Sequence, residues 1–223
     1  MGRDLQRLGK GRAARHAGGL TMIAAISLMR RQDALDLNRF RRHWLDVHGP
    51  LVCAFPELRR YVQCHVVDSV AANEEGLTLR ADGFPILYFD HDADRLRAHH
   101  SPEMAACNID SRQFIGAVSR VIADVDGDLR ANHGRFSLLE IWPEGVAPAA
   151  RPVVYRVREQ GAAPNSVIPL LPIVVGAMTQ TWFDSLVDLE CGAAAMGDSA
   201  SARFVVEEHW FNPRHGPARP GHP

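Results

Sequence analysis

The alternation of apolar and polar positions over residues 21–130 predicts strands and helices in the order βαββαβ. Strands show a period of two, and helices show apolar residues every three or four positions. The predicted strands cover residues 21–29, 59–67, 84–89 and 117–125. One helix is predicted to follow the N-cap Asp36, and a second helical region over residues 91–115 breaks at Ser101-Pro102. This order is typical of a ferredoxin-like α+β unit, in which helices cover one face of a four-stranded antiparallel sheet.

The first helix and the strand after it carry the clearest patterns. The helix has one apolar stripe, formed by Leu37, Phe40, Trp44 and Val47/His48. We expect Gly49-Pro50 to kink or interrupt this helix, because proline has no N–H to donate. One face of the following strand carries Tyr61, Gln63, His65 and Val67, and the other carries Val62, Cys64 and Val66.

The second half of the chain predicts a shortened copy of the same unit. Strands are expected over residues 136–142, 153–158, 174–183 and 203–211, with a short helix over residues 185–196. No helix is expected between the first two of these strands, because the stretch from Trp142 to Pro152 is too short. This half would therefore lack its own first helix.

A spacing match between the halves suggests an internal repeat. The distance along the chain from Tyr61 to Tyr88 equals that from Tyr155 to Trp182, and both copies continue with Phe-Asp. Chance is the alternative explanation for four matching positions. A true repeat predicts two ferredoxin-like units in tandem, the second of them degenerate.

Composition and charge limit the classes of protein that the chain can represent. Of its 223 residues, 46% are hydrophobic and 23% are charged, which excludes a disordered or fibrous protein. The net charge of −1 gives no electrostatic attraction to nucleic acid or to an anionic membrane. The longest apolar run, residues 167–178, is shorter than the ~20 residues of a membrane helix. The four cysteines show no CxxC spacing, so we expect a reduced, cytoplasmic protein.

These features divide the chain into four parts. We expect a flexible basic tail over residues 1–20, a ferredoxin-like domain over 21–130, a degenerate second ferredoxin-like domain over 131–212 and a flexible tail over 213–223. Met22 opens the first strand and is a candidate for the natural start of the protein.

The segment from Met29 to Val67 resembles the EthD family, named for ethyl tert-butyl ether degradation. The matching residues of this segment are Phe40, Trp44, His48, Pro50, Leu51, Pro56, Leu58, Tyr61, Val62, Gln63 and His65. The resemblance continues to about residue 126 through Asp82-Gly83, Tyr88-Phe89-Asp90, Ser101-Pro102-Glu103, Asp110 and Phe114-Ile115. It implies a dimeric α/β barrel, in which two ferredoxin-like units place their sheets together. In a tandem chain, the second half would replace the second subunit, and the sequence leaves open whether two chains associate further.

The residues of the EthD-like pattern suggest acid–base chemistry. If the strand face that carries Tyr61, Gln63 and His65 meets the helix, His48 would take a proton beside a carbonyl group while Tyr61 or Gln63 donates to the developing oxyanion. We therefore predict His48, Tyr61 and His65 as catalytic residues. The predicted substrate-binding residues are Gln63, Trp44, Phe40 and Tyr88. The structural alternative is that His48 caps a helix end and that Tyr61 belongs to the core.

Neither a metal nor an organic cofactor is expected. His43 and His48 are five residues apart, which on an α-helix points them about 140° apart. Ligation of haem by a single histidine stays open in this fold. A nucleophilic pair of Cys53 and His48 is a weaker alternative.

Relatives that share the barrel catalyse many reactions, so the fold does not name one. Our first hypothesis is a cofactor-independent lyase or isomerase that acts on a small hydrophobic carbonyl, lactone or aromatic compound. The alternatives are a non-catalytic binding or accessory protein for such a metabolite and a cofactor-free monooxygenase. Because the second half lacks the helix that supplies His48, we expect any site to lie in the N-terminal half only.

Overall fold

The computed structural model describes residues 22–70, 80–129, 134–162, 167–196, 200–213 and 216–217. The tail expected at residues 1–20 and most of the tail expected at 213–223 lie outside the described residues. No described helix combines the length and the apolar character that crossing a bilayer requires.

The first half folds as the sequence predicts. Its strands are β1 (Ile23–Arg31), β2 (Arg60–Val70), β3 (Gly83–Phe89) and β4 (Ile115–Gly127). Its later helices are α4 (Asp92–His99) and α5 (Pro102–Ser111), separated at Ser101-Pro102 as expected. The side chains of Asp36 and Ser101 accept hydrogen bonds from backbone N–H groups at the starts of α1 (Leu37–His43) and α5, so the cap predicted at Asp36 is confirmed.

The first helix does not end at Pro50. After α1 the chain continues as a π-helical segment, η1 (Trp44–His48), and then as α2 (Gly49–Cys53). The N–H of Gly49 donates to the carbonyl of Trp44, five residues back. This wider turn lets the chain stay helical although Pro50 donates no hydrogen bond. The irregularity expected at Gly49-Pro50 is therefore present as a π-helical segment just before the proline, and the chain remains helical through it.

The second half repeats the strands and lacks the first helix. Its elements are β5 (Phe136–Trp142), β6 (Val153–Gly161), β7 (Ala177–Phe183), α6 (Leu186–Ala195), β8 (Ala202–Asn212) and the short β9 (Gly216–Pro217). Residues 143–152, between β5 and β6, contain no helix.

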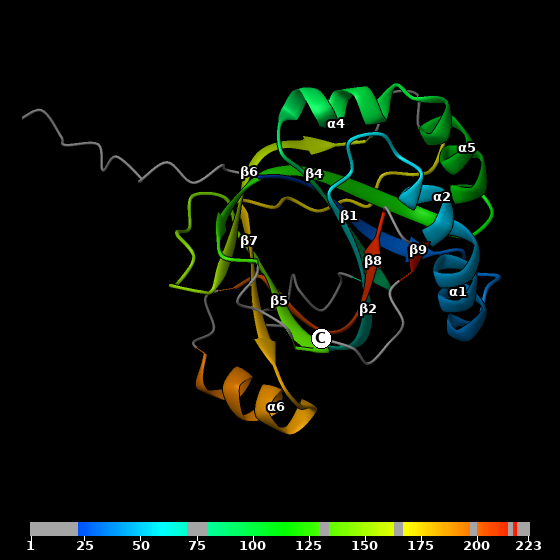
Figure 1. The fold of residues 1–223 in the computed structure, drawn as a ribbon. Helices are drawn as coiled ribbons and strands as arrows, with labels where there is room; N and C mark the ends of the chain where they lie inside the picture. The colour runs from blue at the N-terminus through cyan, green and yellow to red at the C-terminus, as the bar shows by residue number, and fades with distance from the viewer. Residues whose placement is uncertain are drawn as a thin grey trace, which may run out of the picture.

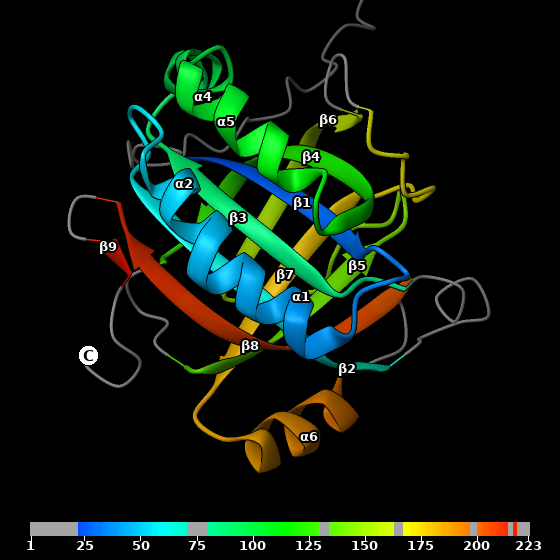
Figure 2. The same ribbon diagram turned by 90° about the vertical axis from the view of Figure 1, so that its right-hand side faces the viewer.

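The two halves close into one eight-stranded antiparallel barrel (Figure 1). The strand order is β4-β1-β3-β2 in the first half and β8-β5-β7-β6 in the second. β2 pairs with β8 and β4 pairs with β6, so each half seals both open edges of the other. The predicted α+β tandem of ferredoxin-like units, forming a dimeric α/β barrel within one chain, is confirmed. The helices lie outside the barrel, and α1, α2 and α5 cross over the first half-sheet (Figure 2).

Of the two residue pairs in the spacing match found in the sequence, one is equivalent in the structure and the other is not. Tyr88 and Trp182 both face the barrel interior, as equivalent positions should. Tyr155 also belongs to the interior cluster, whereas Tyr61 packs outside the barrel with Phe211 and the helices. Side chains alternate between the faces of a strand, so a shift by an odd number of residues exchanges the two faces. Tyr61 and Tyr155 are therefore not equivalent, although the tandem itself is real.

A buried acid sits among hydrogen-bond donors inside the barrel. Glu208 Oε1 accepts from Ser137 Oγ and Gln180 Nε2, both at 2.5 Å. Its Oε2 accepts from the indole nitrogens of Trp182 and Trp210 at 3.0 and 2.9 Å. Burial raises the pKa of Glu208 to about 7, and the four hydrogen bonds oppose this rise only in part.

Glu208 should make the barrel less stable as pH rises. The folded chain holds the Glu208 proton up to about pH 7, whereas the unfolded chain releases it near its ordinary value of 4.5. Its stabilising contribution is full below the unfolded pKa and is lost as pH rises through the folded one. Relative to Glu208→Gln, the wild-type chain should lose about 2 kcal/mol of unfolding free energy between pH 5 and pH 8. Urea titrations of both proteins would measure this difference, and a constant gap would contradict the prediction.

Candidate active site

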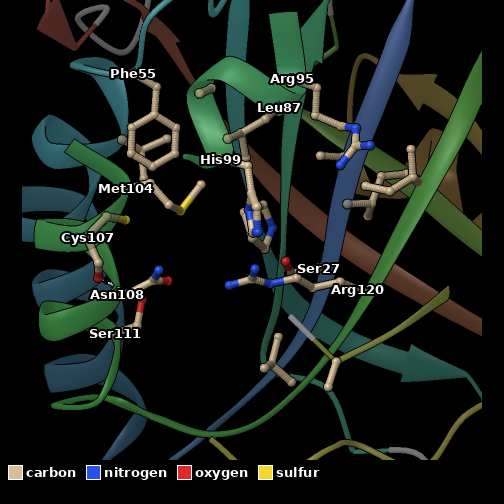
Figure 3. Close-up of a pocket in the computed structure, with 18 of the residues that line it drawn as sticks. Ser27, Phe55, Leu87, Arg95, His99, Met104, Cys107, Asn108, Ser111 and Arg120 are labelled. Carbon is tan, nitrogen blue, oxygen red and sulfur yellow. Dashed lines mark hydrogen bonds between the residues drawn. The ribbon is translucent and has the colours of Figure 1, made fainter. Parts of the chain in front are cut away.

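A cavity of about 520 Å³ lies between the outer face of the first half-sheet and the helices α2, α4 and α5 (Figure 3). Its volume is in the range of small-molecule sites. Its apolar lining includes Val52, Phe55, Leu87, Phe89, Met104 and Ile122. Its polar lining includes His48, Arg95, His99, Asn108, Ser111 and Arg120.

His48 reaches the cavity wall from the end of η1 and is held by Asp110 of α5. Its Nδ1 lies 2.8 Å from Asp110 Oδ2, and Nε2 of His43 lies 3.0 Å from Oδ1 of the same carboxylate. The two histidines share one partner because a π turn places residues five apart on the same side of the helix. The expectation that they diverge rested on α-helical geometry and is wrong.

The partners of His48 determine which ring nitrogen is free. Burial raises the pKa of Asp110, but the hydrogen bond from His48 and the neighbouring His43 outweigh this and hold it below its ordinary value. Asp110 is therefore a carboxylate that only accepts, so His48 donates to it through Nδ1, and in the neutral ring Nε2 is the nitrogen without a proton. Nε2 lies 3.4 Å from Sγ of Cys107. Burial raises the pKa of that thiol to about 12, so it remains an S–H donor.

Tyr61, Gln63 and His65 share the strand face toward the helix, as predicted, but they do not line the cavity. The Tyr61 hydroxyl accepts from Trp44 Nε1 at 3.1 Å and from Gln63 Nε2 at 3.0 Å. His65 Nε2 lies 2.9 Å from Gln63 Oε1, and its ring stacks on Trp44 at 4.4 Å. Burial lowers the pKa of His65 to about 2, so it stays neutral.

Trp44, Tyr61, Gln63 and His65 thus form one set joined by hydrogen bonds and stacking, and no described side-chain hydrogen bond connects this set to His48. The Trp44 ring fills the space above Gly83, where an added Cβ would come within 2.2 Å of it. The predicted convergence of His48 with Tyr61 is not found, because no described hydrogen bond joins the two side chains and only His48 lines the cavity.

The other predicted substrate contacts also lie elsewhere. Phe40 packs with Trp44 and Phe114 in the core under α1. Tyr88 faces the barrel interior, where its hydroxyl lies 2.8 Å from that of Tyr155. Neither residue lines the cavity.

The second half contributes to the cavity, which corrects the expectation of a site confined to the first half. Glu159, Gln160, Gly161 and Ala162 at the end of β6 line it, together with Ile168 of the following loop. β6 reaches this position because it pairs with β4 along the edge of the first half-sheet.

The sequence analysis assigned no role to Cys107 or Arg120, and it counted Asp110 only among the residues of the EthD-like pattern. Asp110 and Cys107 are three residues apart on α5, a spacing that places both on one face of a helix. That spacing was the available signal, but nothing linked this face to His48 before the fold was known. Arg120 gave no signal, because it occupies an outward position within an otherwise ordinary strand pattern.

The fold is that of a dimeric α/β barrel, in which the two halves of one chain take the places of the two subunits. Residues 32–117 match the model of the EthD domain family. None of the curated proteins matches the chain.

Solved structures match it at low sequence identity. A crystal structure described as an anthrone oxidase-like protein has a TM-score of 0.53 and 8% identity, covering 86% of this chain and 94% of its own. An EthD family protein from Bacillus halodurans C-125 has a TM-score of 0.38 and 22% identity, covering 45% of this chain and 95% of its own. A dimeric ferredoxin-like protein of unknown function from Thermobifida fusca YX has a TM-score of 0.33 and 16% identity, covering 49% and 99%. The first of these shares the barrel fold over most of the chain.

Proposed function

We propose that the chain is a cofactor-independent enzyme of the lyase or isomerase type that moves a proton at a carbon next to the carbonyl group of a small hydrophobic molecule. The observation that carries this proposal is the Asp110–His48 pair at the cavity wall. In the neutral ring that this pair orients, the unprotonated Nε2 lies beside Cys107 at the wall of a largely apolar space. Such a group is a suitable general base near neutral pH.

In the proposed step, His48 Nε2 takes the proton from the carbon. The electrons of the broken C–H bond form a C=C bond, and the carbonyl oxygen takes the negative charge. Return of the proton to the same or a neighbouring carbon completes the reaction, so no oxidant is consumed. Asp110 touches His48 and not the substrate, so it acts as a positioning residue.

Hydrogen exchange in ²H₂O tests the proposal directly. Anthrone under nitrogen is a suitable probe, because it is a hydrophobic ketone whose C–H group is acidified by the carbonyl through the intervening aromatic rings, and a protein with the same fold is described as anthrone oxidase-like. 2-Tetralone is the second probe, because it carries acidic C–H groups directly next to its carbonyl. We expect the protein to accelerate deuterium incorporation at that carbon above the buffer rate, as followed by NMR. Unchanged rates with both anthrone and 2-tetralone would count against the proposal.

A non-catalytic binding protein is the second candidate. It is favoured by the hydrogen-bonded set of Tyr61, Gln63 and His65, whose polar atoms are satisfied away from the cavity. Of the residues that the sequence analysis expected to act together, only His48 lines the cavity where a ligand would bind. Saturable binding of anthrone without any exchange would support this candidate in place of the enzyme.

A further inference from the structure

Arg120 places a cation without a counter-ion in the wall of the cavity. It lies on β4 opposite Ser27 of β1 and Gly161 of β6, and its side chain reaches outward into the cavity (Figure 3). Within the described ranges, its guanidinium forms no ion pair and no side-chain hydrogen bond. Burial lowers its pKa, which reflects the cost of desolvating the charge.

The other charges nearby do not neutralise Arg120. Arg95 also lines the cavity, but its Nε is paired with Asp92 Oδ1 at 2.7 Å. Glu159 is exposed at the cavity rim and forms no ion pair with Arg120. A partly buried cation without a partner is costly, and an anion bound from solution would offset this cost.

The surroundings of Arg120 define where that anion would bind. Burial and then the charge of Arg120 lower the pKa of His99 on α4, and the same charge opposes the burial that raises the pKa of Cys107 on α5, so the guanidinium lies near both helices. Asn108 of α5 also lines this space, and its amide has no hydrogen-bond partner among the described side chains. One planar guanidinium with an amide beside it matches a single carboxylate.

We infer that the substrate is a hydrophobic carboxylate whose carboxylate group binds Arg120 while its apolar body packs on Phe55, Leu87 and Met104. This inference rests on the proposed function for the reaction that follows binding, but the binding itself requires no chemistry. An anion fixed at Arg120 would orient the apolar body along the cavity toward His48.

Calorimetry with 2-naphthoate and its uncharged counterpart 2-naphthamide tests the inference, in a buffer free of carboxylate and phosphate. Wild-type protein should bind the carboxylate ~10- to 100-fold more tightly than the amide, as expected for a charge-assisted hydrogen-bonded pair. Arg120→Gln should reduce this preference to about twofold or less while still binding the amide, which shows that the variant is folded. Arg120→Lys should keep part of the preference.

Arg97→Gln is the matched control, because it removes an exposed cation of α4 that does not line the cavity. It should leave both affinities unchanged. Equal affinities for the two probes in wild-type protein, an undiminished preference in Arg120→Gln, or no binding of either probe at millimolar concentration would each overturn the inference. Carboxylate binding that depends on Arg120, without exchange on any ketone, would contradict only the proposed function.

Discussion

Replacing His48 by glutamine should lower the rate of carbon–hydrogen exchange by ~10²–10⁴. Glutamine has a similar size and can hydrogen-bond to Asp110, but it offers no basic nitrogen at the position of Nε2. The loss should appear in kcat with little change in KM, because the base contributes to the transition state and not to substrate binding. NMR exchange rates at several anthrone concentrations would measure both constants.

Asp110→Asn should reduce kcat in the same direction. An asparagine presents one acceptor and one donor to His43 and His48, so at least one of the two histidines must change tautomer. If His48 changes, its Nε2 carries the proton and no longer serves as a base. His91→Asn is a suitable control, because His91 is exposed at the N-cap of α4, outside the cavity, and asparagine is a favoured cap. Unchanged exchange in folded His48→Gln would exclude the assignment of His48 as the base.

Hydrophobic periodicity was sufficient to predict the strands and helices, because each element buries one face. The two faces of β2 were separated correctly, and the structure places Val62 and Cys64 inside the barrel and Tyr61 outside it. The closed barrel followed from the repeat and from the resemblance to the EthD family. The equivalence of Tyr61 and Tyr155 failed because sequence spacing across a deleted helix does not fix which face of a strand a residue occupies.

The site was predicted less well than the fold, and η1 explains part of the difference. Nothing in a propensity pattern distinguishes a π turn from an α turn, yet this turn brings His43 and His48 to one carboxylate. A second reason is steric. Predicting a cleft between the helix and the Tyr61 face required knowing that Trp44 fills that space, whereas the cavity lies beside it, under α4 and α5.

The first half should not persist as a monomer when it is separated from the second. A fragment of residues 22–129 would lose the partners of both edge strands, since β2 pairs with β8 and β4 with β6 in the complete barrel. It would also expose the inner face that packs against the second half, including the contact of Phe84 with Phe204 and the hydrogen bond of Tyr88 with Tyr155. Unpaired strand edges beside an apolar face promote association between chains.

Two outcomes are therefore expected for this fragment: a dimer in which β2 of one copy pairs with β4 of the other, or aggregation. The dimer is sterically reasonable because β6 and β8 occupy, in the second half, the places that β2 and β4 occupy in the first. Sedimentation velocity over a range of micromolar concentrations would distinguish monomer, dimer and aggregate, with the 223-residue chain as the reference. Adding the separately produced second half, residues 134–213, should convert the fragment into a one-to-one complex that unfolds cooperatively. A monomeric fragment with cooperative unfolding of its own would show that the first half does not depend on the second to cover its sheet.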